Sequence, residues 1–180
     1  MRIIAGKYKN TPLQTLEGKD VTRPTRAIVR EAMFSSITIY SDTAFLDLFA
    51  GSGAIGIEAL SRGAEKVVFN DLNPEAVKII RANLNKVKEN RTVYNLDYRS
   101  CLKKEENGGY DYIFCDPPYN FIGYEDIFFD IKRYNNLNQE GIIILEVNKN
   151  TILQDTYLDY QKYKEKHYGV NKLLYYRRNS

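Results

Sequence analysis

Apolar and polar residues along the middle of the chain follow two periods in turn. Five short runs are rich in β-branched, aromatic and other apolar residues, as strands are, and cover residues 43–49, 66–70, 92–96, 110–115 and 141–147. Between the second and third runs, Pro74 opens a segment of residues 75–88 in which apolar positions recur every three or four residues. That segment is predicted to be a helix. Further helices are predicted at residues 55–62, at 124–137 and from about Thr25 to residue 39.

Strands that alternate with helices indicate βαβ units. Such units connect by right-handed crossovers, which place parallel strands in one sheet and helices on both of its faces. The later part of the chain breaks this rhythm. Residues 160–168 and 170–178 alternate, are rich in Tyr and meet at Gly169, as the two arms of an antiparallel hairpin do.

The length of 180 residues fits one domain around a single hydrophobic core. Residues 2–15, with Gly6 among alternating apolar residues, predict a second small hairpin outside the main sheet. We therefore expect one α/β domain over residues 1–180. It consists of an N-terminal β-hairpin extension within residues 1–20 and a doubly wound, Rossmann-like core over residues 21–180.

Composition excludes several classes of protein. Cys101 and Cys115 lie far apart and the chain has one His, so neither a zinc site nor a secreted disulfide scaffold is predicted. No apolar run approaches the roughly 20 residues of a membrane helix, and the first residues lack the apolar segment of a signal peptide. We expect a cytoplasmic protein without a bound metal and without membrane contact.

The net charge of +3 conceals an uneven distribution. Residues 1–30 hold seven Lys and Arg against two acidic residues, and residues 160–180 hold six against one. Each end therefore carries +5, and the part between them carries −7. If the two ends meet in space, they form a basic patch of the kind that contacts a phosphate backbone. Two separately solvated basic ends are the alternative.

A glycine-rich turn follows the first predicted strand. Gly51, Gly53 and Gly56 form the pattern Gly-x-Gly-x-x-Gly between a strand and a helix, where such glycines permit a tight turn and a close approach to a ligand. Asp71 comes 20 residues after Gly51, at the end of the second strand. A carboxylate there would accept hydrogen bonds from two ribose hydroxyls. The combination favours an adenosine-containing ligand over a structural turn.

Two further carboxylates bear on which adenosine ligand is bound. Asp47 lies in the first strand, where it would repel a pyrophosphate but attract the amino group and sulfonium of S-adenosylmethionine. Its alternative role is to cap the amides of the glycine turn. Asp97, after the third strand, would accept from the adenine amino group, or would be the N-cap of a following helix.

The stretch Asp116-Pro117-Pro118-Tyr119 follows the fourth strand. Asp116 is therefore expected at the carboxyl edge of the sheet, beside the glycine turn, where folds of this class bind ligands. Consecutive prolines fix the backbone and leave few local donors for its carbonyls. Asp116 and the carbonyl of Pro117 can accept the two N–H groups of an exocyclic base amine, while Tyr119 stacks on the base. A strand that simply ends in a Pro-Pro turn is the alternative.

These segments together resemble the class I S-adenosylmethionine-dependent methyltransferases. Within that class, FLDLFAGSGAIGIEALSRGA, FNDLNPEA and IFCDPPY, with RIIAGKYKN, TRPT and VREAMF ahead of them, resemble the bacterial family that methylates the guanine N2 of 16S ribosomal RNA. The resemblance implies a seven-stranded sheet with an antiparallel last strand. It also implies a small N-terminal hairpin that contacts RNA.

The resemblance assigns a role to particular residues. The cofactor contacts it implies are Asp47, Gly51 and Gly53 at the methionine part, Asp71 at the ribose, Asp97 at the adenine, and Leu72 as a further contact. The catalytic set at the target base is Asp116, Pro117, Pro118 and Tyr119. The RNA-binding candidates are Arg2, Lys7, Lys9, Arg23 and Arg26.

The function expected from the sequence is methyl transfer from S-adenosylmethionine to the N2 amine of a guanosine. The partner is 16S ribosomal RNA or the small ribosomal subunit, and the enzyme is expected to be a monomer. Because Asp-Pro-Pro-Tyr specifies an amine rather than a base, an adenine-N6 methyltransferase acting on RNA or DNA is an alternative. A non-catalytic RNA-binding module that retains the cofactor pocket is an alternative of another class.

Overall fold

The computed structural model describes residues 1–16 and 23–179, apart from the side chains of residues 23–26. Its centre is an eight-stranded sheet in the order β3-β2-β1-β4-β5-β8-β7-β6. The strands are β1 (Ala44–Asp47), β2 (Lys66–Asn70), β3 (Val93–Tyr94), β4 (Tyr110–Cys115), β5 (Leu137–Asn148), β6 (Thr156–Tyr157), β7 (Tyr160–Tyr168) and β8 (Asn171–Arg178). The pairs from β3 to β5 are parallel, and β8 is antiparallel to both β5 and β7.

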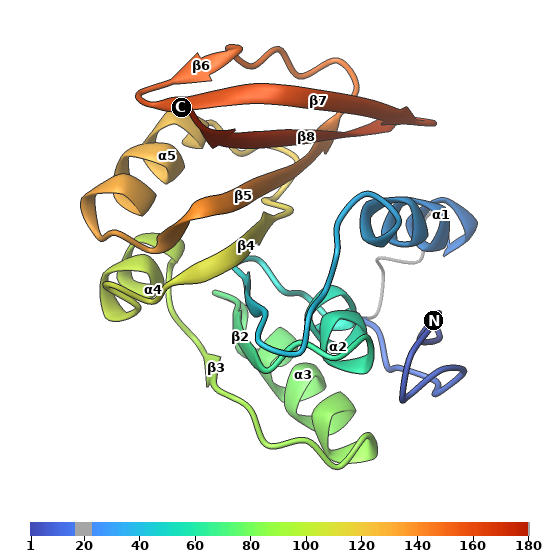
Figure 1. Cartoon of the computed structure of the whole chain (residues 1–180). Helices are drawn as coiled ribbons and strands as arrows, with labels where there is room; N and C mark the ends of the chain where they lie inside the picture. The colour runs from blue at the N-terminus through green and yellow to red at the C-terminus, as the bar shows by residue number, and fades with distance from the viewer. Residues whose placement is uncertain (17–22, 180) are drawn as a thin grey trace.

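Helices cover both faces of this sheet (Figure 1). The helices are α1 (Arg23–Phe34), α2 (Ala54–Ser61), α3 (Pro74–Lys86), α4 (Tyr98–Lys104) and α5 (Tyr124–Arg133). Apolar residues of α1, α2 and α3 form one core with the strands, and those of α4 and α5 form a second core on the opposite face. The predicted doubly wound α/β fold with an antiparallel last strand is therefore confirmed.

The strand count differs from the expected seven because of β6, a two-residue strand at the sheet edge. Tyr157 of this strand is buried, and its ring stacks on Phe128 of α5 with 4.5 Å between centroids. The edge strand is thus held in place by aromatic packing. The sequence pattern did not predict it, because only two residues pair.

The helix predicted over residues 124–137 is shorter in the structure. It ends at Arg133, and Asn135 adopts a positive φ of 49°. The buried side chain of Asn136 then donates to the carbonyl of Leu102 in α4 at 2.9 Å and to that of Glu105, the C-cap of α4, at 2.7 Å. These hydrogen bonds fix the turn, and β5 begins at residue 137.

The predicted N-terminal hairpin consists, in its described part, of two arms joined by one antiparallel bridge between Arg2 and Pro12. Hydrogen bonds from Asn10 N to Ile3 O and from Ile3 N to Thr11 O close it, but neither arm forms a regular strand. Residues 17–20, which the expected extension included, lie outside the described residues.

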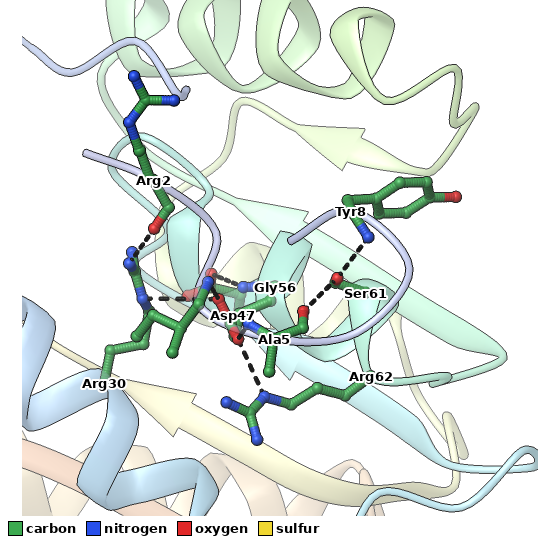
Figure 2. A network of polar contacts seen from close by, with 10 residues as sticks. Arg2, Ala5, Tyr8, Arg30, Asp47, Gly56, Ser61 and Arg62 are labelled. Atoms are coloured by element: carbon green, nitrogen blue, oxygen red, sulfur yellow. Dashed lines mark hydrogen bonds and ion pairs between the residues drawn. The ribbon is translucent and has the colours of Figure 1, made fainter. Parts of the chain in front are cut away.

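Buried Glu58 of α2 attaches this N-terminal segment to the core. Figure 2 shows this region, where Arg30 also contacts Arg2 and Ser61 contacts Tyr8. The carboxylate of Glu58 accepts the backbone N–H groups of Ile4 and Ala5 at 2.8 and 3.0 Å. The guanidinium of Arg62 lies 3.0 Å away, and that of Arg30 of α1 lies 3.8 Å away. One carboxylate therefore connects the N-terminal segment, α1 and α2.

Candidate active site

A cavity of about 990 Å³ opens at the carboxyl ends of β1, β2, β4 and β5. The predicted site residues that line it are Asp47, Gly51, Asp71, Leu72, Asp97, Asp116, Pro117, Pro118 and Tyr119. Residues separated by up to 72 positions are thus gathered at the carboxyl ends of the strands, as the parallel order requires. The predicted cofactor and target residues share one continuous space.

Asp47 combines burial with an unused acceptor. Its side chain is 1% exposed, and its Oδ2 accepts the N–H of Gly56 at 3.0 Å. Its Oδ1 is buried and has no hydrogen-bond partner within the described chain. Burial raises the pKa of Asp47 to about 7, and Asp71 nearby adds to this effect. The capping role and a ligand-binding role are therefore compatible, because each uses a different oxygen.

Of the first two glycines of the turn, Gly51 leaves room for a ligand and Gly53 does not. Gly51 has a φ of +56°, and a Cβ there would meet nothing within 4 Å, so its backbone faces open space in the cavity. Gly53 precedes α2 with a φ of +77° and packs against Ile80, but it does not line the cavity. Its glycine requirement comes from backbone conformation.

The other two carboxylates predicted at the cofactor, those of Asp71 and Asp97, accept hydrogen bonds from backbone N–H groups. Asp71 accepts the N–H groups of Gly51 and Asn73, both at 2.8 Å, one on each oxygen. Asp97 is the N-cap of α4 and accepts the N–H of Ser100 at 3.0 Å, and hydrogen bonds from Ser100 lower its pKa. The N-cap role of Asp97 is thus present. A carboxylate oxygen has a second lone pair, so both side chains can also accept from a ligand.

The Asp-Pro-Pro-Tyr corner also lines the cavity. Cys115 ends β4, and Pro117 is buried while Asp116 and Tyr119 are exposed. The side chain of Tyr119 is 91% exposed, although it lines the cavity. The Pro118 carbonyl accepts the N–H of Phe121 at 2.9 Å and closes the turn. The tyrosine ring is therefore available for stacking on a flat group.

A cluster of four aromatic rings, to which no sequence motif assigned a role, also lines the cavity. The rings are those of Phe49, Tyr98, Phe121 and Tyr124, with centroids 5.1 to 5.8 Å apart. They come from the segments next to the glycine turn, Asp97 and the Asp-Pro-Pro-Tyr corner. Their position directly beside those motifs is the signal that could have identified them.

The N-terminal part of the chain contributes a further wall, which the sequence motifs did not predict. Met1, Thr15, Leu16 and Arg30 line the cavity. Arg30 is 3% exposed, and its guanidinium donates to the carbonyl of Arg2. Burial lowers the pKa of Arg30, and the charge of Glu58 acts against that change. The N-terminal segment is therefore part of the site.

The RNA-binding candidates lie outside the cavity or outside the described side chains. Arg2 donates to the carbonyl of Asn10 at 2.8 Å, and the ammonium of Lys7 lies 4.9 Å from the ring of Tyr8. Lys9 is exposed beside them. The side chains of Arg23 and Arg26 are not described, although both residues belong to α1.

Within residues 1–16 and 23–179, no group of three or more His, Cys, Asp or Glu could hold a metal ion. Cys101 and Cys115 are both buried thiols, and burial raises the pKa of each. None of the helices described there is long and apolar enough to cross a membrane.

Solved methyltransferases share this fold. The structure "Putative methyltransferase yhhF from Escherichia coli" matches with a TM-score of 0.82 and 28% identity, over 100% of this chain and 98% of the other. Its fold is the one described above, and the open space at Gly51 and the unpartnered Oδ1 of Asp47 fit an adenosine ligand with a cationic group. The protein is an S-adenosylmethionine-dependent methyltransferase of class I.

The chain belongs to the family described as Conserved hypothetical protein 95, whose model matches residues 1–177. "Putative rRNA methyltransferase YlbH" of Bacillus subtilis (strain 168) is 34% identical over 183 aligned positions, 99% of each chain. "Ribosomal RNA small subunit methyltransferase D" of Haemophilus influenzae is 34% identical over 154 positions, which cover 83% of this chain and 79% of that one. The resemblance noted from the sequence is confirmed at the level of the family.

Proposed function

We propose that the protein transfers a methyl group from S-adenosylmethionine to the N2 amine of a guanosine in 16S ribosomal RNA. The observation that carries this proposal is the continuous cavity that joins Asp47 and the glycine turn to Asp116 and Tyr119. Relatives that are named for ribosomal RNA methylation support the RNA substrate. The resemblance of the N-terminal segments to guanine-N2 enzymes supports the base.

The cofactor half of the cavity would hold S-adenosylmethionine through residues of three strand ends. The unpartnered Oδ1 of Asp47 would accept from the α-ammonium group, and Asp71 would accept from the ribose hydroxyls. Leu72, which is 69% exposed, and Tyr98 would cover the adenine together with Asp97. When bound, the cofactor supplies an electrophilic methyl group on its sulfonium.

The target half of the cavity would position the base amine. An amine on a nucleobase is a poor nucleophile because its lone pair is delocalised into the ring. The Asp116 carboxylate and the Pro117 carbonyl accept one N–H each, which localises the lone pair toward the methyl group, while Tyr119 stacks on the base. After methyl transfer, the amine loses one proton, and Asp116 passes it to water.

The N-terminal segment would contact the RNA around the target nucleotide. Met1, Thr15 and Leu16 line the cavity, so an RNA that enters it passes this segment. Arg2, Lys7 and Lys9 then provide positive charge for phosphate contacts.

The proposal is tested by identifying the methylated nucleoside. Purified protein is incubated with labelled S-adenosylmethionine and either naked 16S ribosomal RNA or small subunits that lack the modification. We expect labelled N2-methylguanosine. Labelled N6-methyladenosine would refute the base and favour the adenine alternative. Tight RNA binding without incorporation on either substrate would favour the non-catalytic module.

A further inference from the structure

One face of the β7–β8 hairpin carries cations and tyrosines together. We call it the hairpin face and define it by Tyr163, Lys164, Lys166, Tyr168 and Arg177. All five side chains are partly or fully exposed. A bulge between positions 162 and 164 places Tyr163 and Lys164, although consecutive, next to the same residue of β8.

Ring and cation contacts show that these side chains share one side of the sheet. The ring of Tyr163 lies 6.2 Å from that of buried Tyr175, and the Lys164 ammonium lies 4.9 Å from the same Tyr175 ring. The Arg177 guanidinium lies 4.7 Å from the ring of Tyr163. Tyr168 packs against the core that contains Tyr175. This is the side on which α1 lies (Figure 1).

The positive charge of the hairpin face is not neutralised. Within the described chain, none of Lys164, Lys166 and Arg177 forms an ion pair, and the ammonium of Lys166 donates only to the hydroxyl of Ser36 at 3.2 Å. Burial lowers the pKa of Lys164, and the charge of Lys166 lowers it further. Like charges therefore face solvent next to one another.

The opposite face of the same hairpin differs in this respect. There the Lys162 ammonium pairs with Asp155 at 2.8 Å and with Glu165 at 2.9 Å. Lys172 pairs with Glu165 at 3.3 Å. Those two lysines are matched by two carboxylates, and the third cation of that face, Arg178, donates to the side chain of Gln139 and to the carbonyl of Leu137. None of the three cations of the hairpin face has a carboxylate partner within the described chain, so an anionic partner fits this face.

One end of the hairpin face lies near the cavity, because Tyr168 pairs with Asn171, which lines it. β7 runs in the same direction as β5, because each is antiparallel to β8. Tyr168 therefore reaches the sheet edge at which Asn148 and Asn171 line the cavity. From Tyr168 back to Tyr163 the strand covers about 17 Å, at roughly 3.3 Å per residue. A polymer with one unit in the cavity can continue across this surface.

We propose that the hairpin face binds the single-stranded RNA segment that flanks the target nucleotide. Lys164, Lys166 and Arg177 contact its phosphates, and the rings of Tyr163 and Tyr168 stack on its bases. Interleaved cations and aromatic rings on a sheet are the means by which proteins bind single strands without reading sequence. The proposal rests on the proposed function for the identity of the polymer.

The test compares two charge-matched double variants. K164Q/R177Q removes two cations from the hairpin face. K162Q/R133Q removes two cations elsewhere, and its Arg133 also lies over a ring, that of Tyr134, at 5.4 Å. Fluorescence anisotropy measures the Kd of each for a fluorescein-labelled 20-nucleotide single-stranded RNA, without cofactor, from 50 to 200 mM KCl. Urea midpoints establish that all variants are folded.

The expected result follows from counterion release. The association constant for a single strand varies with salt concentration to a power of about −0.7 per phosphate contact. Each lost contact should therefore lower this constant about fivefold at 0.1 M salt. K164Q/R177Q should therefore weaken binding about 25-fold and reduce the slope of log K against log salt by about 1.4. K162Q/R133Q should bind as the wild type does. Y163L should weaken binding with the slope unchanged.

Several outcomes would overturn the inference. Equal Kd values and slopes for the two double variants would show that the hairpin face does not contact RNA. Equal competition by poly-glutamate would indicate an acidic protein partner instead. Failure of the proposed function is distinguishable from failure of this inference. If only the proposed function is wrong, the nucleoside assay gives no N2-methylguanosine, but K164Q/R177Q still binds RNA more weakly than the wild type does.

Discussion

Cofactor binding should depend on pH through Asp47. The pKa of this carboxyl is raised to about 7 by burial, so at neutral pH close to half of the free protein carries it protonated. The α-ammonium of S-adenosylmethionine would pair with the ionised form. Binding must then expel the proton from Asp47, and the apparent affinity follows the ionised fraction.

The magnitude can be worked out from that pKa. Between pH 7 and pH 6 the ionised fraction falls about fivefold, and between pH 6 and pH 5 it falls about tenfold, or about 1.4 kcal/mol. An α-amino group with a pKa of about 7.7 to 8.0 remains protonated throughout this range. The Kd for S-adenosylmethionine should therefore rise roughly 50-fold from pH 7 to pH 5.

Isothermal titration calorimetry at pH 5, 6 and 7 provides the assay. Repeating it in buffers of different ionisation enthalpy counts the protons released. D47N should bind weakly and without this pH dependence. Methylthioadenosine, which lacks the amino-acid part, is the matched ligand control and should bind the wild type almost equally at each pH. A pH-independent Kd for S-adenosylmethionine, without proton release, would refute the assignment of Asp47.

The same pKa predicts the sign of a stability effect. A carboxyl whose folded pKa is raised binds its proton more tightly in the folded state, so it stabilises the fold at low pH and loses this contribution as pH rises toward 7. The difference from the ordinary value corresponds to roughly 4 kcal/mol. D47N should flatten the fall in unfolding free energy between pH 4 and pH 7, measured by urea denaturation.

Three further variants test other parts of the structure. D116A should abolish methyl transfer and leave the Kd for S-adenosylmethionine within about twofold. A large loss of cofactor affinity in calorimetry would show that Asp116 contacts the cofactor rather than the target base. G56A should lower the unfolding free energy by about 1 to 3 kcal/mol, because its Cβ would lie 2.2 Å from the Phe69 ring. Adding F69L to G56A should restore part of the lost stability, measured as the urea midpoint. E58A should cost about 3 to 5 kcal/mol by leaving Arg30 buried without its carboxylate. An unchanged midpoint would show that the Glu58 network does not stabilise the fold.

The sequence predicted the parallel strands well because each carries a strong local signal, whereas it predicted no order of the strands in the sheet. Residues 66–70 and 110–115 are rich in β-branched and aromatic residues, and they coincide with β2 and β4. The glycine turn and Asp71 were predicted from spacing alone, and the structure brings them within 2.8 Å. Motifs at strand ends are predictable because the fold itself gathers those ends at one edge.

Long-range contacts between side chains could not be predicted in the same way. Glu58 lies within an apolar helix and gives no local sign that it accepts hydrogen bonds from Ile4 and Ala5. Tyr157 lies in a strand of only two residues, and its position depends on stacking with the Phe128 ring. The grouping of Tyr163 and Lys164 beside Tyr175 on the β7–β8 hairpin likewise depends on a one-residue bulge. Each of these contacts depends on tertiary packing, which the local pattern of apolar and polar residues does not encode.

The place of β8 inside the sheet has a consequence for the integrity of the chain. Seven residues of β5, from 142 to 148, pair with β8, which also pairs with β7 on its other side. A chain that ends before residue 171 would leave this side of β5, with Ile143, Ile144 and Leu145, as an open apolar edge. Open edges of that kind pair with other chains. Truncated products should therefore aggregate rather than persist as partly active monomers.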